Sequence, residues 1–161
     1  MPDAAMRSAR KVPRVSPARP VAPAADRGTV LAFDFGEKRI GVAVGEFETG
    51  LAHTLPGIDG ERSDARFAAV ARLLAEWRPA RLVVGLPLAT DGSAHAMTLR
   101  ACRFARQLEG RYRVPVVMVD ERYSSLEAES RARAAPGAAG HGIDSSAAQL
   151  ILGQYLQERG R

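Results

Sequence analysis

The sequence is poor in cysteine and in long apolar runs. One cysteine, Cys102, occurs in 161 residues, which excludes an internal disulfide, and no paired Cys/His spacing indicates a zinc site. No stretch approaches the roughly 18 consecutive apolar residues of a membrane span. The N-terminus also lacks the apolar core of a signal peptide. These absences predict a cytoplasmic protein, in a reducing compartment and without a membrane partner.

The sequence also lacks the glycine motifs that bind nucleotide phosphates. Neither GxxxxGK[ST] nor GxGxxG is present. The three histidines, His53, His95 and His141, have no metal-binding partner at a useful spacing. An actin-like ATPase, which needs two lobes with a phosphate loop in each, does not fit a chain of this length. Any chemistry is therefore expected to depend on carboxylates.

Charge is unevenly distributed along the chain. The net charge is +5, but residues 1–27 hold six basic and two acidic residues, whereas the remainder holds 17 and 16. The basic character therefore belongs mostly to the N-terminal segment and is weak evidence for nucleic-acid binding by a folded part. Proline and few apolar residues predict that residues 1–28 are a disordered leader. We expect one folded domain over residues 29–158 and a C-terminal tail over 159–161.

Hydrophobic periodicity predicts an α/β fold. Alternating or continuous apolar runs indicate strands over residues 29–33, 39–45, 51–55, 81–85 and 115–119. Apolar positions three and four apart indicate helices over residues 63–77, 94–109 and 145–158, with another beginning after Ser124. Ser63 or Asp64 is expected to cap the first helix, and residues 136–142 to form a loop. A three-strand meander followed by βα units predicts a mixed five-stranded sheet with helices packed on it.

Acidic residues follow the predicted buried strands. Asp34 comes directly after one strand, Asp120 and Glu121 directly after another, and Asp144 at the start of a helix. The carboxyl ends of neighbouring strands lie side by side in such a sheet, so these carboxylates can converge. Each also has an ordinary structural alternative. Asp34 can be a turn residue, Asp144 a helix N-cap, and Glu121 an exposed charge.

Clustered carboxylates repel one another unless a cation lies between them. Oxygen ligands suit Mg²⁺ or Mn²⁺, and a pair of such ions about 4 Å apart can activate water for phosphodiester cleavage. The loop after the strand over 81–85 contains Gly85 and Ser93, and its amides could hold a phosphate. A purely structural loop is the alternative. The residues thus allow a metal-dependent nuclease as one interpretation, beside the structural alternatives given above.

Four segments together match one family. They read FDFGEKRIGVAVG over 33–45, VVGLPLATDGS over 83–93, VDERYSSLEAE over 119–129 and IDSSAAQLIL over 143–152. In this order they resemble the YqgF/RuvX family, which is described as Holliday junction resolvases and as nucleases that process the 5′ end of pre-16S rRNA. The resemblance implies a ribonuclease H-like fold.

The resemblance also implies roles for individual residues. Asp34, Asp120 or Glu121, and Asp144 would be catalytic, with Asp34, Glu121 and Asp144 binding the metal. Because neighbouring residues at a strand end point to opposite sides, only one of Asp120 and Glu121 should face the metal. Arg122 would contact a substrate phosphate or hold the carboxylate network.

The expected partner is nucleic acid. Structured RNA, the ribosomal precursor in particular, is the first candidate, and branched DNA is the second. Resolving a DNA junction requires two symmetric cuts and hence a dimer, so the sequence leaves monomer and homodimer open. A third interpretation is a non-catalytic RNA-binding factor in ribosome assembly, in which the acids are structural remnants.

Overall fold

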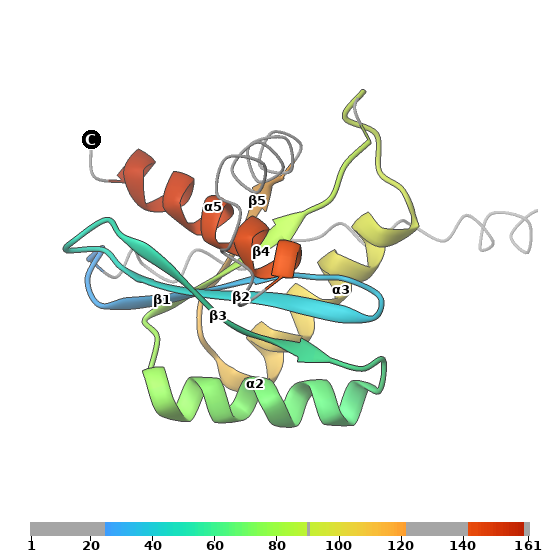
Figure 1. Ribbon diagram of the computed structural model, residues 1–161, viewed down its shortest axis with the longest axis horizontal. Helices are drawn as coiled ribbons and strands as arrows, with labels where there is room; N and C mark the ends of the chain where they lie inside the picture. The colour runs from blue at the N-terminus through green and yellow to red at the C-terminus, as the bar shows by residue number, and fades with distance from the viewer. Residues whose placement is uncertain (1–24, 90, 122–141, 160–161) are drawn as a thin grey trace, which may run out of the picture.

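The described part of the chain folds into a five-stranded sheet with three helices. The computed structural model in Figure 1 describes residues 25–89, 91–121 and 142–159. The elements in chain order are β1 Thr29–Asp34, β2 Arg39–Glu46, β3 Ala52–Asp59, α2 Ser63–Trp77, β4 Arg81–Leu86, α3 Ala96–Tyr112, β5 Val116–Asp120 and α5 Gly142–Arg159. This order confirms the predicted fold class. The helix expected after Ser124 and the loop over 136–141 lie outside the described residues.

The strand order across the sheet is β3-β2-β1-β4-β5. β1 and β2 pair antiparallel, as do β2 and β3, because short connections join them. β4 and β5 are each reached through a helix, so β1 pairs with β4 and β4 with β5 in parallel. The carboxyl ends of β1, β4 and β5 therefore share one edge of the sheet, with β4 in the middle.

Each face of the sheet is covered by a different set of helices. α2 and α3 lie on one side and α5 on the other (Figure 1). In β1, Leu31 and Phe33 pack toward α2 and α3, whereas Val30 and Ala32 pack toward α5. This alternation is the ordinary two-residue period of a strand. Because both faces are covered, β1 is a continuous apolar run.

Three elements, β3, α3 and α5, differ most from the sequence prediction. β3 was expected over residues 51–55 but extends to Asp59. The strand continues through Pro56 because β3 is an edge strand and its pairing with β2 shifts register there, opposite Ile40 and Val42, where proline is tolerated. α3 begins at Ala96 instead of residue 94. α5 begins at Gly142, which was expected to lie in a loop. A glycine is tolerated at the first helical position, because its entropic cost applies chiefly in the middle of a helix.

The helix caps were not the ones predicted. α2 covers residues 63–77 as expected, but its N-cap is Arg62, which makes no side-chain cap, so the prediction of Ser63 or Asp64 was wrong. The carboxylate of Asp64 instead pairs with Arg62 at 3.0 Å. α3 is capped by His95, whose Nδ1 accepts a hydrogen bond from the N–H of Met97 at 3.2 Å. This cap places the start of α3 at residue 96.

α5 is anchored to the sheet at both ends of β4. The guanidinium of Arg81, the first residue of β4, donates hydrogen bonds of 2.7 Å to the Tyr155 hydroxyl and to Asp26. Ile151, one turn earlier in α5, lies against Gly85 near the end of β4. α5 therefore runs antiparallel to β4.

None of the helices in the described residues has the length and apolar character that a bilayer crossing requires.

Candidate acidic active site

Asp34 and Glu121 project from the same face of the sheet. Asp34 is the last residue of β1, two residues after Ala32, which packs against α5. Glu121 directly follows β5 and lies two residues after Val119, which packs on the same side. By strand alternation both carboxylates are therefore on the α5 face, at the carboxyl edge of the sheet.

The two carboxylates approach each other across β4 because residue 85 is glycine. A β-carbon at Gly85 would lie 2.6 Å from Glu121 Oε2, 3.5 Å from Asp34 Oδ1 and 2.8 Å from Ile151 Cδ1. Both carboxylate oxygens are thus within 3.5 Å of one point, directly above the Cα of the central strand. Any side chain at position 85 would occupy this space.

Glu121 holds a buried oxygen without a hydrogen-bond donor. Its backbone is fixed, since its N–H donates to the Leu86 carbonyl at 3.2 Å and extends the ladder beyond β5. Among the residues that the structure describes, however, Oε2 of Glu121 is buried and accepts no hydrogen bond. A buried carboxylate without a partner is costly, and a second carboxylate beside it increases that cost. A divalent cation would supply the missing positive charge, so the pair fits a metal site.

Asp120 lies on the other face of β5. Met118 packs with the α2 and α3 side of the core, and Asp120 follows it by two residues. The sequence left Asp120 and Glu121 open as alternatives. The structure brings Glu121 beside Asp34 and directs Asp120 away from it.

The other predicted acid, Asp144, lies in the first turn of α5. Because Ile151 contacts the end of β4 and Tyr155 its start, the N-terminal end of α5 points toward the edge where Asp34 and Glu121 stand. Within the part of the chain covered by the structure, no three His, Cys, Asp or Glu residues gather closely enough to hold a metal ion. The structure therefore shows a pair of carboxylates. The side chains of residues 142–145, and Arg122 as a whole, lie outside the description.

The loop with Ser93 forms an internally bonded turn. The N–H and the hydroxyl of Ser93 both donate to the carboxylate of Asp91, at 2.8 and 2.6 Å. Gly92 donates to the Ala89 carbonyl at 2.8 Å, and Ala89 to that of Ser93 at 3.0 Å. The Ser93 amide, expected to bind phosphate, is thus already used within the turn. Gly85, the other residue expected to bind phosphate, instead provides the space in which Asp34 and Glu121 approach each other.

Arg66 supports the site and was missed by the sequence analysis. Its side chain is buried, and it donates hydrogen bonds of 2.8 and 2.5 Å to the carbonyls of Gly36 and Glu37, in the connection that follows Asp34. A third bond of 2.7 Å reaches Gly60. Burial lowers the pKa of Arg66. The available signal was position, because Arg66 falls four residues before Val70 on the apolar face of its helix.

The sequence matches proteins with a shared description. A family model described as RuvX, Holliday junction resolvase, matches residues 28–158. A protein of Burkholderia mallei (strain SAVP1) is 55% identical over 128 residues, which cover 80% of this chain and 87% of the relative. One from Methylobacillus flagellatus is 52% identical over 137 residues, covering 83% and 93%. Both carry the name "Putative pre-16S rRNA nuclease".

Solved structures share the fold at low sequence identity. RuvC of T. thermophilus, in complex with a Holliday junction substrate, aligns with a TM-score of 0.54 at 20% identity over 81% of this chain and 95% of that one. The Fowlpox virus resolvase, in complex with Holliday junction DNA, aligns with a TM-score of 0.53 at 11% identity over 83% and 99%. These likenesses establish the resolvase-like fold of the chain.

Proposed function

The chain belongs to the RuvX family, whose members are hydrolases of phosphodiester bonds, and we propose that it is a divalent-metal-dependent endonuclease with Asp34, Glu121 and Asp144 as its ligands. The observation that carries this proposal is the buried Oε2 of Glu121, which meets Asp34 over Gly85 without a donor of its own. Mg²⁺ or Mn²⁺ suits such a set of carboxylate oxygens.

The chain's own residues would prepare the site for hydrolysis. A bound divalent ion supplies the Lewis acid that activates water and stabilises the leaving oxygen. Asp34 and Glu121 are held by the parallel strands on either side of β4, so their separation is set by the sheet and needs little rearrangement when a ligand binds. Ile151 closes the α5 side of the pair with an apolar group, which limits access by bulk water. Asp144 would complete the ligand set from the first turn of α5.

We propose structured RNA, the 5′ end of pre-16S rRNA in particular, as the substrate, in the cytoplasm. The shared name of relatives that are 52 and 55% identical over most of both chains supports this choice. The family description favours a second candidate, branched DNA. Cleavage of a junction would require two symmetric cuts by a homodimer, so a strictly monomeric enzyme would argue for the RNA substrate.

Cleavage assays with three variants test this proposal. Labelled pre-16S rRNA and a four-way DNA junction are each incubated with protein and Mg²⁺. We expect wild type and Asp120→Asn to cut the RNA, and Asp34→Asn and Glu121→Gln to lose about 100-fold or more of the rate, as the loss of several kcal/mol of metal stabilisation requires.

The alternative outcomes identify the alternative functions. Cleavage of the junction alone would replace RNA by DNA as the substrate. RNA binding by a wild type that cuts neither substrate would indicate a non-catalytic assembly factor. Equal rates for wild type and Asp34→Asn would show that the acidic pair is not the active site.

A further inference from the structure

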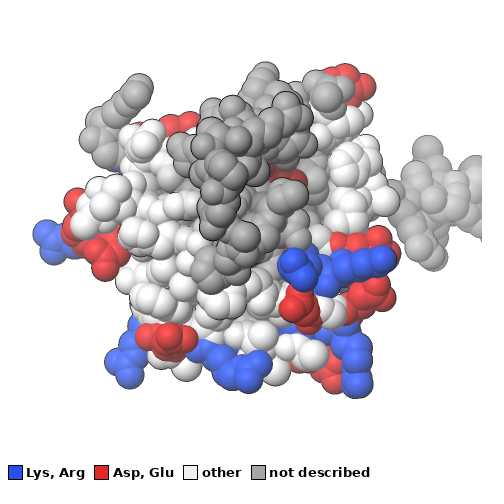
Figure 2. Space-filling model, viewed as in Figure 1, with Lys and Arg blue, Asp and Glu red and all other residues white. Residues whose placement is uncertain are grey.

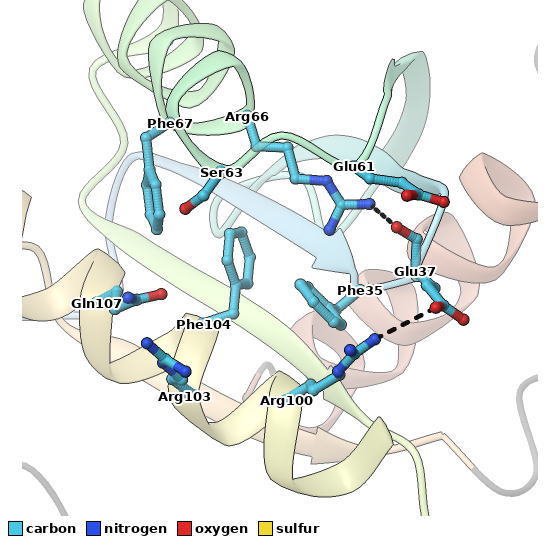
Figure 3. Close-up of a pocket in the computed structure, with 10 residues that line it drawn as sticks. All are labelled: Phe35, Glu37, Glu61, Ser63, Arg66, Phe67, Arg100, Arg103, Phe104 and Gln107. Atoms are coloured by element: carbon cyan, nitrogen blue, oxygen red, sulfur yellow. Dashed lines mark hydrogen bonds and ion pairs between the residues drawn. The ribbon is translucent and has the colours of Figure 1, made fainter. Parts of the chain in front are cut away.

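A second concave site lies on the opposite face of the sheet from the acids. It is a cavity of about 330 Å³ between α2, α3 and the β1–β2 connection. Figure 3 shows Arg66 and Ser63 extending from α2 on one side, Arg100 and Arg103 from α3 on the other, and the rings of Phe35 and Phe104 between them. None of these residues was assigned a function from the sequence.

Aromatic rings form one wall of this cavity. Phe104 lies with its ring centroid 5.2 Å from that of Phe35 and 5.9 Å from that of Phe67. Phe67 and Phe104 are buried, whereas Phe35 is half-buried at the cavity. Flat apolar walls of this kind accept the face of a nucleobase, and because every base has such a face the contact tolerates sequence variation.

Positive charge in the cavity is incompletely balanced. Arg66 is buried, its hydrogen-bond acceptors are neutral carbonyl oxygens, and its guanidinium carbon lies 5.2 Å from the centroid of the Phe35 ring. Arg100 lies 3.6 Å from Glu37, in an ion pair at the rim with both side chains more than half exposed. Within the described ranges, Arg103 has neither a hydrogen bond nor an ion pair. Three arginines thus face two acids, Glu37 and Glu61, around the cavity.

Residues 28–161 carry a net charge of only +1, with 17 basic and 16 acidic residues. On the face in Figure 2, Lys and Arg are interleaved with Asp and Glu along the lower rim, around α2. Residues 28–161 therefore offer little general attraction for a polyanion. Arg100 and Arg103 line the same cavity as the aromatic rings, and arginine forks match phosphate oxygens in geometry as well as charge.

The cavity also lies next to the acidic pair along the chain. Phe35 directly follows Asp34, and the two side chains leave β1 toward opposite faces of the sheet. A nucleic-acid strand that passes around the end of β1 would meet both. The exposed position of Arg100, whose side chain is 56% accessible, leaves the rim open for a strand to continue.

We propose that this cavity binds an unpaired nucleotide of the strand that the acidic site cleaves. Its phosphate would bind Arg103 and Arg100, and its base would lie against Phe35, which packs on the buried Phe104. The inference rests on the proposed function for the identity of the strand, and it adds a preference for substrates with single-stranded nucleotides beside the cleavage position. A free nucleotide offers the same chemical groups, so the test must separate the two sources.

Binding of a labelled single-stranded RNA oligonucleotide to the full chain in EDTA, followed by fluorescence anisotropy, tests the cavity without cleavage. Arg103→Glu and Arg106→Glu are matched, because both arginines are exposed on α3 and only Arg103 lines the cavity. We expect Arg103→Glu to raise the Kd about tenfold or more, as loss of a charge-assisted phosphate contact predicts. Arg106→Glu should raise it about threefold or less. Equal weakening by both variants would overturn the proposal.

Two further measurements separate the ligand's source and the role of the base. An oligonucleotide with abasic sites should bind wild type more weakly than the intact one, and equal affinity would overturn the aromatic contact. AMP and inorganic phosphate should compete only at concentrations far above that of the oligonucleotide. Effective competition at equal concentration would assign the cavity to a free ligand. Thermal unfolding of Arg103→Glu checks that it remains folded, and Arg103→Gln should show an intermediate Kd.

Failure of the cavity and failure of the nuclease proposal are distinguishable. A difference between Arg103→Glu and Arg106→Glu in EDTA supports the cavity even when wild type proves unable to cleave. Cleavage that depends on Asp34 but is equally affected by the two arginine substitutions supports the acidic site and removes the cavity.

Discussion

Oε2 of Glu121 lies 2.6 Å from the position that a β-carbon of Gly85 would occupy. The glycine is on the strand between the two acidic strands, so its missing side chain is the space in which the carboxylates meet. The requirement is one of volume, and it makes position 85 a sensitive test of the site.

Gly85→Ala should destabilise the fold and impair the site together. The added methyl group would also lie 2.8 Å from Ile151 Cδ1, so the core is overpacked, at a cost of about 1–3 kcal/mol. Urea unfolding measures this loss, and cleavage should fall with it. Gly110→Ala in α3 is the matched control, since nothing lies within 4 Å of its would-be β-carbon. That control should gain about 0.5–1 kcal/mol. Wild-type stability in Gly85→Ala would contradict the close contact.

Glu121→Gln should separate folding from metal binding. In EDTA the substitution removes a buried negative charge beside Asp34, so we expect a Tm equal to or above that of wild type. At a Mg²⁺ concentration about 100 times the Kd, wild type should gain about 2.7 kcal/mol by mass action, and Glu121→Gln should gain little. Asp120→Asn, on the opposite face, should keep the gain. A lower Tm of Glu121→Gln in EDTA would mean that Glu121 has a structural partner.

Arg66→Met should loosen the connection that follows Asp34. Methionine retains much of the buried stem but leaves the carbonyls of Gly36, Glu37 and Gly60 without their donor, which should cost about 1–3 kcal/mol. Arg66→Lys should recover only part of this loss. Its ammonium group can donate hydrogen bonds but cannot reproduce the planar fork of the guanidinium. Denaturant unfolding compares the three proteins. A loss for Arg66→Met within the error of measurement would show that water replaces these bonds.

Glu48 should contribute to the loss of stability in acid. Its carboxylate accepts a 2.8 Å hydrogen bond from the N–H of Gly28, and this bond is the main cause that lowers the pKa of Glu48 below 4.5. A lowered pKa in the folded state means that the stabilisation is present above the unfolded pKa and is lost as the pH falls through the folded one. Glu48→Gln should therefore reduce the difference in unfolding free energy between pH 7 and pH 3. Glu76→Gln, on the exposed side of α2, is the control. Unchanged pH dependence in Glu48→Gln would refute this role.

The sequence predicted those features that depend on local pattern. The apolar spacing from Phe67 to Trp77 identifies α2, and the short connection after Asp34 determines that β1 and β2 pair antiparallel. Placement of acids at strand ends also predicted that Asp34 and the Asp120–Glu121 pair share an edge of the sheet. These conclusions need only periodicity and chain connectivity.

Features that depend on distant partners were not accessible in this way. Asp120 and Glu121 point to opposite faces of the sheet. Which of them meets Asp34 depends on which face α5 covers, and the sequence does not show this. The contribution of Gly85 depends on the strand order, which places β4 between β1 and β5. The cap of α3 was missed because it uses the ring nitrogen of His95, whereas capping residues are usually Ser, Thr, Asp or Asn.

The attachment of α5 to both ends of β4 also fixes the angular position, around the helix axis, of the residues that precede Ile151. Asp144 lies seven residues earlier in the same helix, which at 3.6 residues per turn returns it to nearly the same angular position. Inserting a single alanine between Ser146 and Leu150 would leave the anchors at Ile151 and Tyr155 unchanged and turn Asp144 by about 100° around the helix axis. The proposed three-acid centre thus depends on the number of residues between Asp144 and Ile151, and not only on their identity.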